Sequence, residues 1–193
     1  MLRRLYDWTL SLAGKRHALS ALAAISFIES SVFPIPPDVL LLPMVLARPE
    51  RAWLIATVCS VASVAGGLLG YAIGALLFDS VGRFVVDLYG YTDQFETFRQ
   101  AYEEWGFWIV AGAGFTPFPY KVITIASGVA ALNLPVFLLA SAVSRSARFF
   151  LEAALLWRFG APIRDFVERH LPVLTWLFFA LLLGGFLSVR YLF

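Results

Sequence analysis

Charged side chains are scarce in this chain of 193 residues. Only 15% of its residues are charged, whereas 60% are hydrophobic. A soluble domain of that composition would expose large apolar patches to water, so the sequence predicts a protein embedded in a bilayer. The formal charge of +2 is too small, and the basic residues are too dispersed, for a nucleic-acid surface. We therefore expect no nucleic-acid partner.

Cysteine and histidine are nearly absent as well. The one cysteine, Cys59, lies inside an apolar run, which excludes an internal disulfide. The two histidines, His17 and His170, stand at segment ends, and no serine occupies a nucleophile-elbow setting. The sequence also shows no metal-ligand cluster, so we expect no metal and no other cofactor. These absences argue against an enzyme of lipid metabolism, which stays open only as an alternative.

Proline interrupts the first long apolar run, 18–47. Three prolines stand near its middle: Pro34, Pro36 and Pro37. Proline removes a helical hydrogen bond and restricts the residue before it, so a single straight helix is excluded. We expect two short helices, over 18–32 and 38–47, joined by an extended turn. Because non-helical backbone at membrane depth has to be enclosed by protein or line a wet cavity, the run predicts a re-entrant hairpin.

The rest of the chain alternates between apolar and polar segments. Three apolar runs have the length of a membrane-spanning helix. They cover 52–78, 135–157 and 172–190. The polar segment 79–105 is expected outside the cytoplasm, with a helix in its second half. The apolar run 107–132 is broken by Pro117 and Pro119 and predicts a second re-entrant hairpin, while residues 1–16 predict an interfacial amphipathic helix.

Basic residues in the short loops predict an orientation. The N-terminal 17 residues carry four bases and one acid, and the next short loop carries Arg48 and Arg51. If the first hairpin returns to the side it entered, both groups lie in the cytoplasm with the N-terminus, and the acidic segment 79–105 lies outside. If both hairpins crossed fully, the two basic groups would fall on opposite sides, which is the weaker alternative.

An internal repeat relates the two hairpins. With an offset of 83 residues, 34–40 aligns with 117–123, and both read Pro-x-Pro-x-charge-Val-aliphatic. A chance match of seven residues is the alternative. Hairpins that enter from opposite sides make the repeat inverted, as in many secondary transporters. The predicted fold is thus one all-α polytopic membrane domain, 1–193: an inverted repeat of two re-entrant helical hairpins, each followed by a transmembrane helix, plus a C-terminal transmembrane helix.

The span 52–78 carries glycines four residues apart, at Gly66, Gly70 and Gly74. Small residues at this spacing let a neighbouring helix approach closely. We expect these glycines to pack helices rather than to bind a ligand.

Six ionisable side chains fall at membrane depth. They are Glu29, Asp38, Lys121, Arg145, Arg148 and Glu152. Each costs about 2.5–3.5 kcal/mol at a helix centre, so we expect them to face one another or water. Spacings of three and four residues place Arg145, Arg148 and Glu152 on one helix face. One interpretation is a purely structural ion-pair network, no more stabilising than an apolar core because desolvation offsets the Coulomb attraction.

The other interpretation separates two roles. Lys121, Arg145 and Arg148 would bind an anionic headgroup, since arginine suits bidentate contacts with phosphate. Glu29 or Asp38 would take up and release a proton, because desolvation favours the neutral form of a carboxyl group. Two further residues would support this site: Tyr120 and Glu152. The predicted function is then proton-coupled movement of an anionic lipid, and a non-transporting membrane assembly factor is the alternative.

Four ordered motifs carry a resemblance to a known family. They are Phe27-Ile28-Glu29-Ser30-Ser31-Val32-Phe33-Pro34-Ile35-Pro36-Pro37-Asp38, Gly66-Gly67-Leu68-Leu69-Gly70-Tyr71-Ala72-Ile73-Gly74, Phe115-Thr116-Pro117-Phe118-Pro119-Tyr120-Lys121 and Ser127-Gly128. Over roughly 18–160 the chain resembles the DedA family, also called the VTT-domain or SNARE-associated Golgi protein family, and within it the small YqaA-like branch.

The resemblance implies a multi-pass protein of the bacterial inner membrane with two opposed re-entrant hairpins. It implies a part in returning undecaprenyl phosphate across the membrane or, as for eukaryotic relatives, in phospholipid scrambling. The family's functional acids near the first hairpin match Glu29 and Asp38, and its arginines after the second match Arg145 and Arg148. Many members also carry arginines around the second hairpin's proline, where this chain offers Lys121 instead. The partners would be membrane lipids and protons, and a homodimer stays open.

Overall fold

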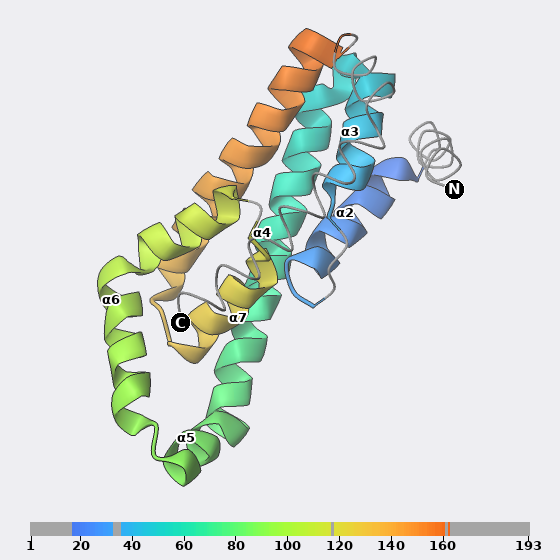
Figure 1. Ribbon diagram of the computed structural model, residues 1–193. Coiled ribbons are helices and arrows are strands. Elements are labelled where there is room, and N and C mark those ends of the chain that lie inside the picture. Colours follow the sequence, from blue (N-terminus) through green and yellow to red (C-terminus); the bar gives the residue numbers. More distant parts are fainter. Residues whose placement is uncertain (1–16, 33–35, 117, 161, 163–193) are drawn as a thin grey trace. The chain divides into compact units, whose positions relative to one another are not determined.

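The computed structural model describes residues 17–32, 36–116, 118–160 and 162. These residues form α-helices, a 3-10 turn and a π-helical turn joined by short connections (Figure 1). In chain order they are α2 (Ala18–Glu29), α3 (Asp38–Ala47), the 3-10 turn (Pro49–Arg51), α4 (Ala52–Leu77), the π-helical turn (Phe78–Gly82), α5 (Arg83–Tyr89), α6 (Thr92–Phe115), α7 (Tyr120–Val129) and a helix Leu134–Gly160. The chain divides into two compact units, Met1–Trp157 and Arg158–Phe193, and the side-chain contacts discussed below lie in the first.

Several predicted features lie outside the described residues. They are the interfacial helix 1–16, the C-terminal span 172–190, Pro34 and Pro117.

The first proline-broken segment has the predicted two-helix form, with α2 ending three residues earlier than expected. The Ser31 hydroxyl donates a hydrogen bond to the Phe27 carbonyl at 3.0 Å, the acceptor that its own backbone N–H would use in a continued helix. That N–H bonds instead to the Ile28 carbonyl, three residues back. The chain is tighter at this point, and α2 stops at Glu29, ahead of the prolines.

The second proline-broken segment differs from the prediction in its first arm. The polar stretch ending at 105 and the apolar stretch starting at 107 form one continuous helix, α6. No proline interrupts α6, so the backbone stays helical where the side chains change from polar to apolar. The helix ends at Phe115, and the next residue, Thr116, has an extended ψ of 166°. This residue precedes Pro117, and the proline ring disfavours the helical conformation of its predecessor.

Two helices are long and apolar enough to cross a membrane, α4 with its preceding turn and the helix Leu134–Gly160. They correspond to the predicted spans 52–78 and 135–157. The 26 residues of α4 extend about 39 Å, more than the hydrocarbon thickness of a bilayer. The two helices lie side by side, with the rings of Trp53 and Phe150 stacked at 6.1 Å (Figure 1). Large apolar side chains remain exposed on both: Val61, Leu68, Leu76, Leu139, Val143, Leu151 and Leu155.

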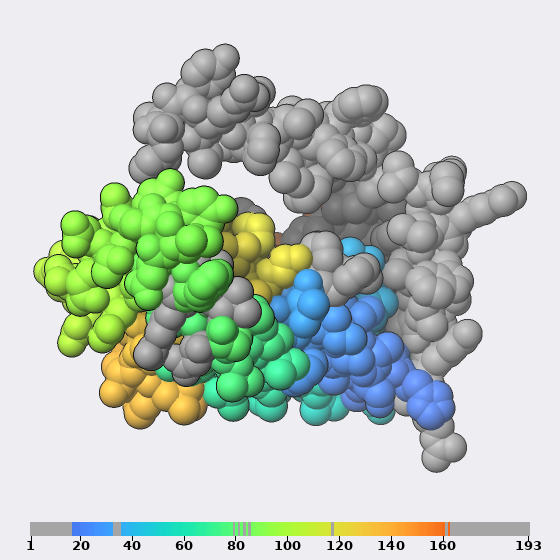
Figure 2. All heavy atoms as spheres, turned by 90° about the horizontal axis from the view of Figure 1, so that it is seen from below, coloured from blue at the N-terminus to red at the C-terminus, as the bar shows by residue number. Residues whose placement is uncertain are grey.

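Helices α2 and α7, one from each proline-broken segment, pack against the glycine-lined face of α4. A Cβ atom at Gly66 would collide with the Phe27 carbonyl of α2, and one at Gly74 with the Ile125 carbonyl of α7. The predicted packing role of these glycines is confirmed. Helix α7 lies between α6 and α2, as its yellow atoms between the green and blue ones show (Figure 2). The two broken segments therefore meet beside α4.

We expect Gly74→Ala to lower the free energy of unfolding by about 1–3 kcal/mol, because the added methyl group forces α4 and α7 apart. Gly112→Ala is the matched control. A Cβ atom there meets nothing within 4 Å, so the control should stabilise α6 by about 0.5–1 kcal/mol. Thermal unfolding in detergent measures both. If the two variants unfold at the same temperature, the close approach of α4 and α7 is wrong.

Candidate functional site

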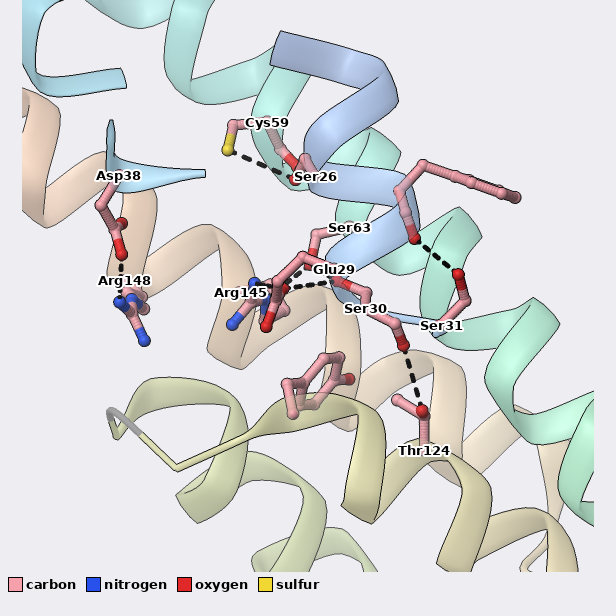
Figure 3. A network of polar contacts seen from close by, with 12 residues as sticks. Ser26, Glu29, Ser30, Ser31, Asp38, Cys59, Ser63, Thr124, Arg145 and Arg148 are labelled. Carbon is pink, nitrogen blue, oxygen red and sulfur yellow. Dashed lines mark hydrogen bonds and ion pairs between the residues drawn. The ribbon is translucent and has the colours of Figure 1, made fainter. Parts of the chain in front are cut away.

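Arg145, on the helix Leu134–Gly160, is a deeply buried charge with 2% of its side chain exposed. Its Nε donates to Ser63 Oγ at 2.6 Å and its Nη2 to Glu29 Oε2 at 3.0 Å (Figure 3). The guanidinium group also lies 4.7 Å from the ring centroids of Tyr120 and Phe149. The planar fork of arginine is suited to combine an ion pair, a hydrogen bond and ring contacts. The buried charge is thereby compensated.

Hydroxyl groups hold Glu29 in position. The Ser30 hydroxyl lies 3.1 Å from Glu29 Oε2 and 2.7 Å from Ser63 Oγ, so it joins α2 to α4. Thr124 Oγ1 of α7 donates to the Ser30 carbonyl at 3.1 Å. Such hydrogen bonds between helices are typical of membrane proteins, where small polar side chains tie neighbouring helices together. The end of α2 is therefore bonded to both α4 and α7.

Arg148 contacts three elements through three nitrogen atoms. Its Nη2 donates to Asp38 Oδ2 of α3 at 2.8 Å, and its Nε donates to Glu152 Oε1 at 3.1 Å. Its Nη1 donates to the Thr116 carbonyl at 3.1 Å, at the C-terminal end of α6, where the helix dipole favours a cation. Arg148 thus joins the first broken segment, the break in the second and its own helix.

The structure brings together five of the six charges predicted at membrane depth. They are Glu29, Asp38, Arg145, Arg148 and Glu152. Lys121, in the first turn of α7, is directed instead to the segment after α2, where its Nζ is 3.5 Å from the Val32 carbonyl. Tyr120, predicted to support the site, places its ring against Arg145 and donates its hydroxyl to Ser141 at 2.5 Å. We call the five charges the ion-pair cluster.

The prolines predicted at the hairpin turns that fall within the described residues stand just before α3 and α7. Pro37 precedes α3 and Pro119 precedes α7, and Pro36 lies just ahead of Pro37. Proline suits the start of a helix because its fixed φ is compatible with helix and its missing N–H is not needed there. Asp38 and Lys121 consequently occupy the first turns of α3 and α7. The helix dipole favours the carboxylate at this position and disfavours the lysine.

Sequence-based reasoning missed the polar groups that hold the cluster together. Ser63 stands three residues before Gly66 on the helix-packing face of α4, which was a usable signal. Ser30 and Thr124 had no such signal, and the Thr116 carbonyl is a backbone group that only the break before Pro117 exposes. Within the described residues, no group of three or more His, Cys, Asp or Glu side chains is placed to hold a metal ion.

Comparisons with known proteins identify the family. Residues 35–158 match the VTT domain. An uncharacterized protein of Haemophilus influenzae and one of Histophilus somni are 40% and 41% identical to this chain over 168 residues, and each alignment covers 85% of this chain and 87% of the relative. No solved structure matches. The matched span contains most of the ion-pair cluster, with Glu29 ahead of it, and the chain belongs to the VTT-domain family, the DedA family of membrane proteins.

Proposed function

We propose that this chain moves an anionic lipid, such as undecaprenyl phosphate or a glycerophospholipid, across the bacterial inner membrane in a proton-coupled manner. The observation that carries the proposal is the convergence of both proline-broken segments on the ion-pair cluster. Asp38 of the first segment and the Thr116 carbonyl of the second bind the same guanidinium group, that of Arg148. Secondary transporters commonly build substrate and ion sites where broken helices meet. The chain is then a flippase or scramblase and not an enzyme.

Helix lengths support a re-entrant arrangement. The helices α2, α3 and α7 have 12, 10 and 10 residues, well below the 20 or so that a spanning helix needs. In this proposal, 18–47 and 107–132 each enter and leave on one side and form an inverted repeat. The N-terminus and the loop with Arg48 and Arg51 then face the cytoplasm, in keeping with the distribution of basic residues.

Lys121 is the proposed first contact for the lipid headgroup. It is partly exposed and stands in the first turn of α7, where the helix dipole also attracts an anion. Arg148 comes next, with 18% of its side chain exposed. Arg145 is engaged by Glu29 and Ser63, so a headgroup reaches it only by displacing the carboxylate. This order of exposure gives the three basic residues successive roles.

Lys121→Gln is expected to slow the movement of undecaprenyl phosphate about tenfold, because one charge-assisted contact of about 1.5 kcal/mol is lost. Arg99→Gln is the matched control. It removes one positive charge from the exposed Arg99–Glu96 pair of α6 and should leave the rate unchanged. The assay uses proteoliposomes containing undecaprenyl phosphate or a fluorescent phosphatidylethanolamine, each with and without a pH gradient.

The same assay decides between the candidate functions. If neither lipid moves while a known scramblase works under the same conditions, transport is wrong and an assembly factor is favoured. Mass spectrometry of the recovered lipids tests the enzyme alternative, which requires a chemically altered lipid. Equal rates of lipid movement for the wild type and Lys121→Gln would show that Lys121 does not bind the headgroup during transport.

A further inference from the structure

Arg148 holds two separate carboxyl groups on one edge of its guanidinium group. The edge consists of Nε, which donates to Glu152 Oε1, and Nη2, which donates to Asp38 Oδ2. Figure 3 shows the pair of Arg148 with Asp38. This edge has the spacing of the two oxygens of a single carboxylate. Two carboxyl groups that share it are brought close together, one from α3 and one from the helix Leu134–Gly160.

The outer oxygen atoms of this carboxyl pair lack partners. Asp38 Oδ1 and Glu152 Oε2 are buried, and neither has a hydrogen-bond partner within the described residues. An unpaired buried carboxylate oxygen is costly, and two ionised carboxylates at this range repel each other. One proton between the two groups converts the repulsion into a hydrogen bond and satisfies oxygen atoms that otherwise have nothing to accept.

The charge balance of the cluster points to the same pair. Within the described part of the chain, three carboxyl groups face two guanidinium groups, so full ionisation leaves one excess negative charge. Glu29 of α2 is matched by Arg145, so the excess falls on the pair beside Arg148. The other titratable groups nearby are Cys59 of α4 and Tyr120 and Lys121 of α7. Lys121 Nζ is directed to the Val32 carbonyl, three residues past the end of α2.

We infer that Asp38 and Glu152 share one proton beside Arg148, and that this pair, rather than Glu29, is the proton-binding site of the protein. Uptake of a second proton neutralises the pair and leaves the charge of Arg148 to an anionic headgroup. One negative charge of the headgroup then replaces one negative charge of the pair, so the net charge of the cluster is unchanged. The link to lipid movement rests on the proposed function, whereas the shared proton is a property of the resting protein.

Infrared spectroscopy of the full-length protein in lipid nanodiscs tests the shared proton. A protonated carboxyl group gives a carbonyl band that shifts in D₂O, and we expect this band at neutral pH in the wild type. Asp38→Asn and Glu152→Gln should each abolish it, because the remaining carboxyl group is then matched by Arg148 and ionises. Glu103→Gln, an exposed acid of α6, is the control that keeps the band.

Each outcome decides the inference. A band that survives in both variants places the proton elsewhere, and loss in only one variant assigns it to that residue alone; either result overturns sharing. Displacement of the band by sodium ions at constant pH would make the pair a sodium site and also overturn it. Size-exclusion chromatography monitors folding, and if Asp38→Asn fails to fold, Asp38→Ser takes its place, because serine also suits the start of a helix. If the band behaves as expected and no lipid moves, the proposed function fails while the shared proton stands.

Discussion

Arg145→Met should lower the free energy of unfolding by about 3–5 kcal/mol, because it removes the counterion of Glu29, a carboxylate with only 15% of its side chain exposed. The wild-type guanidinium has 2% of its side chain exposed and is bonded to Glu29 and Ser63. Methionine keeps much of the side-chain volume, so the loss measures the missing charge and hydrogen bonds rather than a cavity. Chemical unfolding in detergent micelles, followed by tryptophan fluorescence, gives the value.

The double variant Glu29→Gln/Arg145→Met removes both charges and is expected to recover most of this loss. Replacing both members of a buried pair by neutral groups is often close to neutral, whereas removing one is not. A double-mutant cycle on the surface pair Glu96–Arg99 is the control. Its atoms are 3.9 Å apart and its side chains are about half exposed, so its coupling should stay below about 1 kcal/mol. An Arg145→Met variant as stable as Arg99→Met would contradict the buried pair.

Lipid movement by the same double variant separates the two interpretations of the cluster. A stable double variant that moves no lipid makes the Glu29–Arg145 pair part of the transport path. A stable double variant with the wild-type rate makes the pair purely structural.

Arg148→Lys should slow lipid movement by a factor of ten or more and lower the free energy of unfolding by about 2–3 kcal/mol. Arginine donates here in three directions, to Asp38, Glu152 and the Thr116 carbonyl. Lysine keeps the charge but is a compact point charge on a flexible stem, so it cannot hold all three acceptors in this geometry. The proteoliposome assay and chemical unfolding measure the two effects.

Arg99→Lys is the control for this substitution, since Arg99 is exposed and its ion pair with Glu96 is long, at 3.9 Å. It should change neither quantity. Wild-type transport by Arg148→Lys would show that a positive charge alone is sufficient at this position.

Local physical chemistry made much of the fold predictable. Apolar runs long enough to span a membrane predicted α4 and the helix Leu134–Gly160, which begin within one residue of the expected positions. The prolines at 34–37 and 117–119 predicted breaks because the ring geometry and the missing N–H act within one helical turn, whereas the single Pro43 is accommodated inside α3. The end of α2 at Glu29 was missed, since it lies ahead of the prolines, at a tightened turn in which the Ser31 N–H bonds three residues back.

The sequence by itself also determined which charges had to find partners, because an ionised side chain at membrane depth is costly wherever it lies along the helix. Only the tertiary structure decided which partners they found. Glu29 pairs with Arg145 across 116 positions of the chain, and Asp38 with Arg148 across 110. The opposite pairing was equally compatible with the spacings. Which carboxylate pairs with which arginine depends on ångström-scale distances, set by the packing of α2 and α3 against α4. The Ser63 hydroxyl beside Arg145 and the Thr116 carbonyl beside Arg148 contribute to the choice. Such distances follow from packing rather than from position in the chain.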